Sequence, residues 1–514
     1  MERRDGDYHL PAATDGGKGL HLPSTWQGLA FAADKDRPLP QAPAAPPLAV
    51  DLDGTLVKTD LFMESLVALL RRNLLYLAMV PLWLLKGRAN LKRQVSRRCT
   101  LDVSLLPYQP RLVDYLKAQR ERGRRLVLAT GADELLAHQV ADHLHLFDLV
   151  VSSNGIQNLS PRQKRDRLVE EFGEQGFDYA GNERGDLIVW RSARKAVVVR
   201  PKLGARRAAE RIARVDEIFD DDREPLLSYL RALRLHQWLK NLLVFVPLLA
   251  AHRVSEFALT GRALLAVLAF GLCASSGYLL NDLADLPSDR RHPRKRRRPF
   301  ASGEISLLSG LFLIPALLAM SALLGLLLPP LFLAMLGIYY GVSLAYSLAL
   351  KRHALFDVIV LAGLYALRVA AGSAAVQIWP SPWLLAFSIF LFLSLALVKR
   401  YAELVAIAGT AGESATARGY QPGDGELLAA MGTASGYVAV LVLAIYIASG
   451  TAQLLYSRHE FIWLLCPLLL YWISYVWLMA HRGKMNDDPL VFALRDRASW
   501  IVLLLAALTL LLAV

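Results

Sequence analysis

Three aspartates recur at helical spacing in the stretch 281–289, which reads Asn-Asp-Leu-Ala-Asp-Leu-Pro-Ser-Asp. On a helix, residues three and seven positions apart share one face, so Asp282, Asp285 and Asp289 would lie together. Carboxylates gathered at a membrane boundary repel one another and lose hydration, and a divalent cation relieves both costs. Mg²⁺ binds a few carboxylates, keeps its waters and bridges to substrate phosphates. We therefore interpret the three aspartates as the magnesium site of a diphosphate substrate, although Pro287 ends or kinks the helix before the third.

A basic run follows directly and reads His-Pro-Arg-Lys-Arg-Arg-Arg-Pro over 292–299. Guanidinium groups bind phosphate oxygens with parallel hydrogen bonds. An acidic face followed by a basic run is what a metal–diphosphate ligand needs. The alternative is a solvated loop whose basic residues only set membrane topology, and that reading leaves the spaced aspartates unexplained.

A second set of candidate residues lies near the N-terminus, where a short strand at Leu48–Val50 runs into Asp51-Leu-Asp53-Gly-Thr. Two carboxylates at a strand end can share Mg²⁺ while one of them attacks phosphorus. Further along the chain, Thr130 stands at another strand end, where a hydroxyl and backbone N–H groups can hold a phosphoryl group. Lys164 opens the next helix and can neutralise charge, and Asp186 follows a fourth strand.

The chain has 514 residues, enough for two or three domains. Alternating strands and helices after the N-terminal segment predict a parallel sheet with flanking helices, and the apolar second half predicts an all-α membrane bundle. We divide the chain into four regions. Residues 1–47 are a disordered lead-in without a signal peptide, and residues 48–203 are an α/β domain with cap or membrane-associated helices at 61–110. Residues 204–234 are a charged linker, and residues 235–514 are a polytopic domain.

The polytopic part contains nine candidate spans, each near the length that crosses a bilayer. They are expected at 238–252, 261–280, 305–327, 330–348, 355–377, 383–400, 428–448, 461–480 and 498–514. Lysine and arginine gather in the loops on the side of the N-terminal domain, which predicts a multi-pass protein of the inner membrane with that domain and the catalytic loops in the cytoplasm. The net charge of +13 then reflects cytoplasmic loops, anionic lipid and phosphate ligands, so no nucleic acid is expected as a partner.

Four stretches of the polytopic part resemble the UbiA superfamily of intramembrane prenyltransferases, and most closely its polyprenyl-phosphate (decaprenyl-phosphate) phosphoribosyltransferase branch. They are Arg234–Asn241, Asn281–Pro299, Tyr346–Lys351 and Lys399–Leu404. The resemblance implies Mg²⁺-dependent transfer of 5-phosphoribose from phosphoribosyl pyrophosphate to polyprenyl phosphate, with Asp282 and Asp285 as catalytic metal ligands. It also implies substrate-binding roles for Lys240, Asn241, Asn281, His292, Lys295, Arg298, Tyr346, Lys351, Lys399, Arg400 and Glu403.

One departure separates this chain from ordinary members of the superfamily. Those enzymes have a second aspartate-rich motif in a later cytoplasmic loop, whereas loop 401–427 has acidic residues without that spacing. The difference favours phosphoribosyl transfer over the alternative, a prenyltransferase that uses prenyl diphosphate and an aromatic acceptor. A non-enzymatic lipid-binding or transport protein would leave both metal motifs unexplained.

The α/β domain resembles the haloacid-dehalogenase superfamily of aspartyl phosphatases, with a Rossmann-like fold. The resemblance implies that Asp51 is the nucleophile, Asp53 the general acid/base, Thr130 and Lys164 phosphate ligands, and Asp186 a residue of the magnesium site. Relatives often have Gly-Asp where this chain has Gly181-Asn182, so a degenerate, regulatory domain is the alternative. An active domain would remove the 5-phosphate and give polyprenyl-phosphoryl ribose for cell-envelope glycans.

Overall fold

The computed structural model describes residues 45–73, 75–220, 225–408, 419–450, 455–485 and 488–513. The lead-in expected to be disordered falls almost entirely outside the described residues, as does part of loop 401–427.

A six-stranded parallel sheet forms the core of the N-terminal region, with strand order β3-β2-β1-β4-β5-β6. The strands are β1 (Leu48–Val50), β2 (Leu126–Asp133), β3 (Leu149–Ser153), β4 (Asp178–Gly181), β5 (Ala196–Val199) and β6 (Val215–Phe219). The short strand β1 is central, and its Val50 lies opposite Leu128 of β2 and Ala180 of β4. Both faces of such a sheet are covered, which explains why the central strands are nearly uninterrupted runs of apolar residues. The predicted α/β fold is confirmed.

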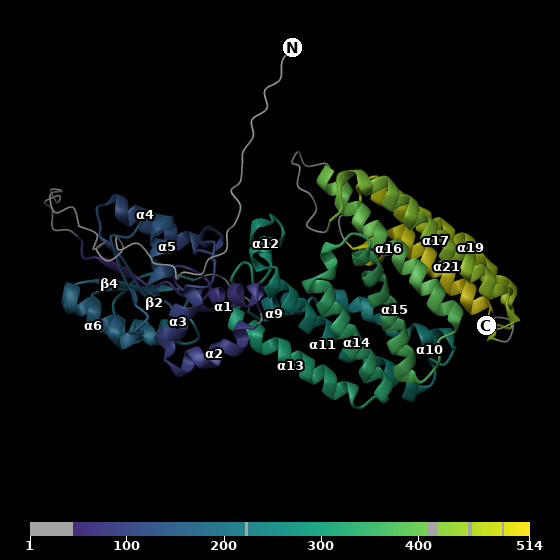
Figure 1. Ribbon diagram of the computed structural model, residues 1–514, viewed down its shortest axis with the longest axis horizontal. Coiled ribbons are helices and arrows are strands. Elements are labelled where there is room, and N and C mark those ends of the chain that lie inside the picture. Colours follow the sequence, from purple (N-terminus) through teal and green to yellow (C-terminus); the bar gives the residue numbers. More distant parts are fainter. Residues whose placement is uncertain are drawn as a thin grey trace, which may run out of the picture. The chain divides into compact units, whose positions relative to one another are not determined.

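Helices pack on both faces of this sheet (Figure 1). One face is covered by α4 (Pro110–Glu121) and α5 (Glu134–Leu144), which share an apolar core with β1 and β2. The other is covered by α6 (Pro161–Phe172), α7 (Leu187–Ser192) and α8 (Ala205–Ile212). The carboxyl ends of β1, β2 and β4 meet at one edge, which is where ligands bind in folds of this kind.

The predicted linker is wrong over its first half. Residues 204–224 were expected to be a charged connection, but they contain α8 and the edge strand β6, which pairs with β5. The strand reads Val-Asp-Glu-Ile-Phe and has two exposed acidic side chains. An edge strand tolerates such charges because only one of its sides is paired, and this is why composition alone suggested a linker.

Three helices follow the first strand, namely α1 (Leu61–Arg72), α2 (Tyr76–Leu85) and α3 (Arg88–Ser96). Helix α1 is half-buried, and its Met63 and Val67 share a core with Leu283 and Phe300 of the C-terminal half. Helix α2 differs, because only Trp83 among its residues is buried.

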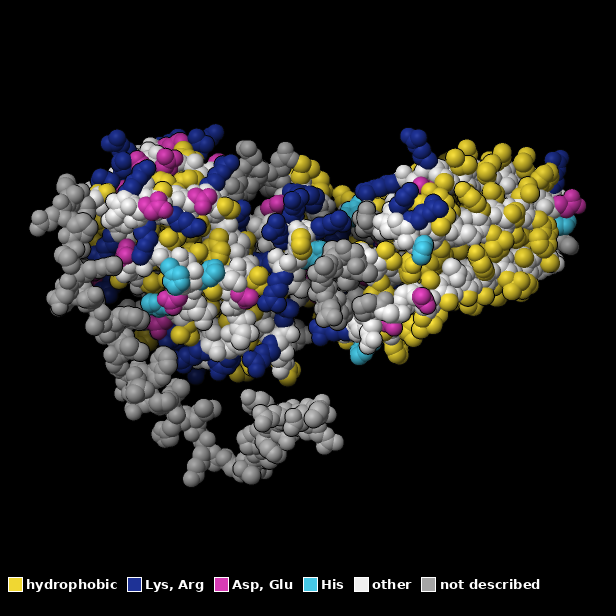
Figure 2. Space-filling model, turned by 90° about the horizontal axis from the view of Figure 1, so that it is seen from above, with side chains coloured by type: hydrophobic (Ala, Val, Ile, Leu, Met, Phe, Trp, Pro, Cys, Tyr) yellow, Lys and Arg dark blue, Asp and Glu magenta, His cyan; other side chains and the backbone are white. Residues whose placement is uncertain are grey.

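The C-terminal half is a bundle of long apolar helices whose outer surface is covered by hydrophobic side chains, as the right side of Figure 2 shows. Among the described residues, seven helices are long and apolar enough to span a membrane: α11 (Phe257–Ala284), α13 (Leu307–Gly325), α14 (Pro330–Leu348), α15 (Phe356–Val376), α16 (Pro382–Ala408), α17 (Gly425–Ala448) and the stretch His459–His481, which includes α19 (Leu465–His481). The chain is therefore a multi-pass membrane protein.

The expected count of nine spans is not confirmed. The first and last candidates correspond to shorter apolar helices, at Leu235–Ala250 and Arg497–Ala513. The first begins as the 3-10 helix η4 (Leu235–Phe245) and continues as α10 (Val246–Ala250). Its Val244 and Leu248 are buried in the bundle, whereas many leucines of the last helix, α21 (Arg497–Ala513), are exposed.

Candidate functional site

A cavity of about 380 Å³ opens inside the helix bundle at the end of α11. It is lined by side chains from η4, α11, α14, α15 and α16 and from the segments after α11, α14 and α19. The lining residues include Arg234, Lys240, Asn281, Asp285, Lys295, Arg298, Tyr339, Tyr346, Lys351, Tyr365, Arg368, Lys399, Glu403 and Asp488. Nine of the residues predicted from the sequence are in this set: Lys240, Asn281, Asp285, Lys295, Arg298, Tyr346, Lys351, Lys399 and Glu403.

The three aspartates of the predicted magnesium site are split between two positions. Asp282 and Asp289 are buried and share one guanidinium, because Nη1 of Arg298 lies 3.0 Å from Oδ1 of Asp282 and 2.7 Å from Oδ2 of Asp289. Arg234 also donates to Asp282. Burial raises the pKa of Asp289, and Arg298 opposes that shift.

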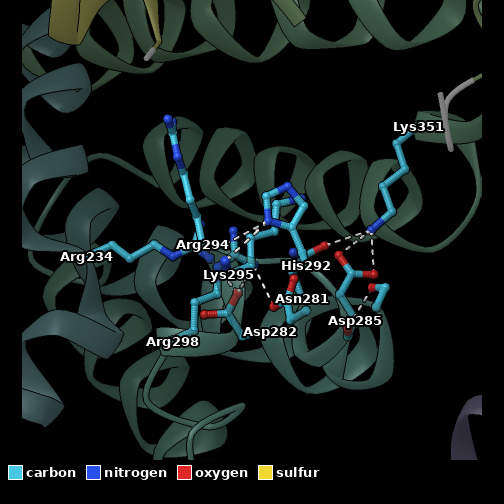
Figure 3. A network of polar contacts seen from close by, with 11 residues as sticks. Arg234, Asn281, Asp282, Asp285, His292, Arg294, Lys295, Arg298 and Lys351 are labelled. Atoms are coloured by element: carbon cyan, nitrogen blue, oxygen red, sulfur yellow. Dashed lines mark hydrogen bonds and ion pairs between the residues drawn. The ribbon is translucent and has the colours of Figure 1, made fainter. Parts of the chain in front are cut away.

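Asp285 lies on the other side of the turn, where Nζ of Lys351 contacts both its oxygens at 2.9 and 3.0 Å and Oδ1 of Asn281 at 3.0 Å (Figure 3). Helix α11 ends at Ala284, and the short helix α12 (Leu286–Arg291) restarts with Pro287 in its first turn. A helix interrupted before Asp289 was expected. The helix instead ends before Asp285, and Asp285 rather than Asp289 is the carboxylate set apart. Within the described ranges, no three His, Cys, Asp or Glu side chains come together as a metal-ligand group.

The donor set nevertheless suits Mg²⁺, which prefers carboxylate oxygens and takes only one or two of them beside substrate phosphates. Each aspartate is paired with a cation that can turn to a phosphate instead: Arg234 and Arg298 on one side of the turn, and Lys351 on the other. The loop thus offers a buried pair of carboxylates, Asp282 and Asp289, and a more exposed single one, Asp285, rather than one triad.

The cavity lining also includes a carboxylate, Asp488, that was not predicted from the sequence. Oδ2 of Asp488 accepts from Nζ of Lys240 at 2.7 Å and from Nζ of Lys399 at 3.2 Å. Burial raises the pKa of Asp488, but Lys399 and Lys240 lower it by more. The net shift of this pKa is therefore downward. Asp488 lies after α19 and directly before α20 (Pro489–Arg495), with no motif around it, so only the fold connects it with the two predicted lysines.

Two predicted residues outside the cavity lining, Asn241 and Arg400, have structural partners. Oδ1 of Asn241 accepts from Arg368 at 3.1 Å. Arg400 is fully buried and donates to Asp357, to Glu403 at 2.6 Å and to Tyr346 at 3.1 Å. These contacts place Arg400 behind the cavity wall, where it orients two residues that do line it.

His292 lies outside the cavity lining. Its Nδ1 accepts from the backbone N–H groups of Arg294 and Lys295, at 3.2 and 3.4 Å. The imidazole therefore shapes the start of the basic run, and Lys295 and Arg298 are the members of that run that reach the cavity.

The second site lies at the carboxyl edge of the sheet, where the predicted residues do converge. Nζ of Lys164, from α6, lies 2.6 Å from Oδ1 of Asp51, and the Thr55 hydroxyl donates to Oδ2 of Asp51 at 3.1 Å. Lys164 also donates to the Tyr179 hydroxyl at 3.0 Å, and that hydroxyl donates to Asp186 at 2.9 Å. Tyr179 was missed because its position in β4 predicts only a core residue.

Asp53 has the environment of a proton donor. Burial raises its pKa well above the ordinary range, and the nearby charges of Asp60 and Asp51 raise it further. Its Oδ1 accepts from the backbone N–H of Leu61 at 2.8 Å, which fixes the carboxyl at the start of α1. A carboxyl that keeps its proton near neutral pH can act as a general acid.

Asp186 is held by its own hydrogen bonds. Burial, with the nearby Asp51 charge, raises its pKa to about 6. Besides the Tyr179 hydroxyl, its carboxylate accepts from the backbone N–H groups of Asn182 and Glu183, at 2.9 and 3.0 Å. Thr130 is buried at the end of β2, where its hydroxyl oxygen accepts from the N–H of Ala132 at 3.0 Å.

Asn182 supplies the test of whether Mg²⁺ fits this edge. The side chain is buried, and among the described residues its Oδ1 has no hydrogen-bond partner. It packs on the Asp51–Thr55 turn so closely that a Cβ on Gly54 would lie 2.3 Å from its Nδ2. An unpaired buried carbonyl oxygen is costly, and a cation that accepts neutral oxygen ligands removes the cost. The amide that departs from the family pattern therefore remains a suitable magnesium ligand.

Comparisons with known proteins show which family the chain belongs to. The UbiA prenyltransferase family matches residues 242–500. An uncharacterized protein of Sinorhizobium fredii, y4nM, is 36% identical over 460 residues, which is 89% of each chain. The decaprenyl-phosphate phosphoribosyltransferase of Mycobacterium tuberculosis is 36% identical over 180 residues, 34% of this chain and 59% of that enzyme. A solved HAD family hydrolase from Salmonella enterica serovar Typhi matches with 13% identity and a TM-score of 0.26, over 36% of this chain and 72% of that one.

Proposed function

We propose that this chain, which belongs to the UbiA prenyltransferase family, transfers 5-phosphoribose from phosphoribosyl pyrophosphate to a polyprenyl phosphate. The observation that carries the proposal is the bundle cavity, which is lined both by the aspartate loop with its cations and by Lys240 and Lys399, which share Asp488. Two separate groups of cations suit two phosphate-bearing substrates. The relative named decaprenyl-phosphate phosphoribosyltransferase supports the same reaction.

In the proposed reaction, an oxygen of the lipid phosphate attacks the anomeric carbon of the donor. A new C–O bond forms to the lipid phosphate, and the C–O bond to pyrophosphate breaks. Bound Mg²⁺ would neutralise the charge that builds on the departing pyrophosphate. Asp282, Asp285 and Asp289 would hold that ion, while Arg298 and Lys351 would turn from carboxylates to phosphate oxygens and Lys295 would add a further cation.

We further propose that the sheet domain removes the 5-phosphate from the product. Asp51 attacks phosphorus, and Asp53 gives its proton to the ribose oxygen as the P–O bond breaks. Water then hydrolyses the aspartyl phosphate and releases inorganic phosphate. Lys164 stabilises the charge on the phosphoryl group, and Tyr179 with Asp186 holds Lys164 in place. Asn182 would be a neutral ligand of Mg²⁺ in this site.

We also propose that the protein is an inner-membrane enzyme and that both sites face the cytoplasm. The aspartate loop, its basic run and the sheet domain lie at the same ends of the spans, where lysine and arginine predominate. Phosphoribosyl pyrophosphate is water-soluble and would reach the cavity from that side.

A donor assay tests this function against aromatic prenylation. Purified full-length protein is incubated with Mg²⁺, polyprenyl phosphate and either phosphoribosyl pyrophosphate or prenyl diphosphate with 4-hydroxybenzoate. We expect labelled ribose in the lipid fraction and no prenylated aromatic product. Prenyl diphosphate consumption with phosphoribosyl pyrophosphate left intact would refute the proposal, and adding EDTA provides the control for metal dependence.

A further inference from the structure

Arg368 is a buried cation in the membrane-spanning helix α15 and is 4% exposed. Its guanidinium donates to Oδ1 of Asn241 at 3.1 Å, to the carbonyl of Leu364 at 2.7 Å and to the hydroxyl of Tyr339 at 2.8 Å. It also lies over the rings of Tyr339, Tyr365 and Phe270, with centroid distances of 4.8, 5.4 and 6.0 Å.

Every one of these partners is neutral. Within the described residues, Arg368 forms no ion pair, although it is inside a membrane bundle. Arg400, the other arginine buried in a spanning helix, is paired with the carboxylates of Asp357 and Glu403. An ionisable residue inside a membrane normally pairs with an opposite charge or marks a ligand pathway. The missing counter-ion of Arg368 therefore points to a ligand.

The position of Arg368 identifies the charge of that ligand. Arg368 lines the bundle cavity together with Lys240 and Lys399. Nζ of Lys240 lies 5.5 Å from the centroid of the Tyr365 ring that Arg368 also faces. This wall has three cations, and the only carboxylate that contacts them in the described chain is Asp488. It has an excess of positive charge that an anion would balance.

We propose that Arg368 and Lys240 bind the phosphate monoester of the lipid acceptor, an assignment that rests on the proposed transferase function. A guanidinium binds phosphate with two parallel hydrogen bonds, and the ammonium adds a point charge. The lipid is assigned here, rather than the sugar donor, because the loop aspartates contact Arg234, Arg298 and Lys351. Within the described residues, those aspartates form no ion pair with Arg368 or Lys240. Apolar side chains of spanning helices, Leu361 and Leu364 among them, line the cavity beside Arg368 and suit a prenyl chain.

Binding can be measured without catalysis, from the thermal unfolding midpoint of the full-length protein in detergent. We expect polyprenyl phosphate to raise the midpoint of the wild type and polyprenol, which lacks the phosphate, to leave it unchanged. Arg368→Met should weaken polyprenyl phosphate binding by about 30-fold or more, the usual result of truncating one partner of a buried charged contact. Arg262→Met changes an exposed arginine of α11 that lies outside the cavity and should bind as the wild type does.

The outcomes separate the two sources of phosphate. If Arg368→Met weakens binding of phosphoribosyl pyrophosphate or inorganic phosphate instead of the lipid, or if polyprenol stabilises as well as its phosphate, the assignment is wrong. If Arg368→Met does not fold, the same binding measurement is made on Arg368→Lys and Lys240→Met. Both variants are expected to bind polyprenyl phosphate more weakly than the wild type. Intact lipid binding with no donor consumption would overturn the proposed function and leave this site standing.

Helix α2 of the sheet domain carries a second, independent signal. Within α2, Leu77, Leu82, Leu84 and Leu85 are 61%, 55%, 48% and 84% exposed, and Leu75, directly before the helix, is 75% exposed. Residues 65–101 contain no Asp or Glu and eight basic residues, namely Arg71, Arg72, Lys86, Arg88, Lys92, Arg93, Arg97 and Arg98.

We infer that α2 lies in the surface of the bilayer and binds anionic phospholipid. Its 10 residues are too few to span the hydrocarbon core, and a short apolar helix between basic clusters is typical of an interfacial segment. Helix α1, directly before it, packs against the membrane bundle, so the chain brings α2 to the lipid. Lipid contact would keep the phosphatase site beside a lipid-linked substrate.

A fluorescent label on Leu84→Cys tests this contact in nanodiscs that contain anionic phospholipid. The native cysteines, Cys99, Cys273 and Cys466, are first replaced by serine. Spin-labelled lipid should quench the probe at 84 at least about twice as strongly as a probe on Leu203→Cys, a leucine that is 97% exposed on the same domain. Equal quenching at both positions, or protection of position 84 by a second copy without quenching, would contradict the inference. Leu77→Cys repeats the test if the first variant does not fold.

Discussion

Asp282→Asn is expected to reduce phosphoribosyl transfer by at least about 10²-fold, with little change in the amount of folded protein. Asp282 is buried and forms ion pairs with both Arg234 and Arg298. The amide keeps the size and one hydrogen bond, but it removes the charge that would hold Mg²⁺ against the leaving pyrophosphate. Loss of one preorganised electrostatic contact in an active site costs ~10²–10³-fold in rate.

The measurement is single-turnover transfer of labelled ribose to polyprenyl phosphate over a range of Mg²⁺ concentrations. The variant should need more Mg²⁺ as well as react more slowly, which a purely structural role would not produce. Ser288→Ala, on an exposed position of α12, is the matched control and should react at the wild-type rate. Wild-type transfer by Asp282→Asn would exclude the aspartate loop as the metal site.

The separate position of Asp285 has a consequence for the same loop. Because Lys351 neutralises Asp285 on the more exposed side of the turn, this carboxylate is the one best placed to meet an incoming metal–diphosphate. Under the proposed function, Asp282 and Asp289 would be released from Arg298 when phosphate oxygens take that guanidinium. In this arrangement, the binding of the donor and the assembly of the metal site depend on each other.

The parts of the fold that were predictable are those in which neighbouring residues carry the signal. Asp51, Asp53 and Thr130 follow apolar strands, and parallel strands place their carboxyl ends together, so their convergence followed from the chain order. Lys164 was found in the same way, at the start of the helix after the third strand. The long apolar helices were equally clear, because hydropathy is a local property.

Residues that fold into a site from distant segments were not predictable in this way. Asp488 reaches the cavity only because separate helices pack side by side, and nothing in its own surroundings in sequence marks it. Arg368 has one local signal, a charge within the apolar stretch Phe356–Val376, but its partners and its place at the cavity depend on the packing. The sequence around Tyr179 predicts only a core residue, whereas in the structure its hydroxyl accepts a hydrogen bond from Lys164 and donates one to Asp186. The split of the three aspartates depends on where α11 stops, which a spacing rule cannot determine once a proline follows.

Asp51→Asn is expected to abolish release of the 5-phosphate while the transfer reaction continues. Its Oδ1 is fixed by Lys164 at 2.6 Å and its Oδ2 by the Thr55 hydroxyl, so the carboxylate is held in one orientation at the strand end. An amide is not a nucleophile toward phosphorus, and losing the nucleophile costs up to ~10⁶-fold in a hydrolase. Polyprenyl-phosphoryl-5-phosphoribose should therefore accumulate as the sole labelled lipid, where the wild type gives the dephosphorylated product.

Mass spectrometry of the lipid fraction distinguishes these two products, and inorganic phosphate release gives the rate. Asp114→Asn, on an exposed position of α4, should behave as the wild type. If Asp51→Asn still yields polyprenyl-phosphoryl ribose at the wild-type rate, then the sheet domain is not the phosphatase and Asn182 marks a domain that has lost its chemistry. If instead the wild type itself stops at the phosphorylated lipid, and Asp51→Asn changes nothing, the domain serves the bundle only through α1, whose buried Glu64 pairs with Arg290 one residue beyond Asp289. The lipid product thus decides between a second catalytic site and a support for the first.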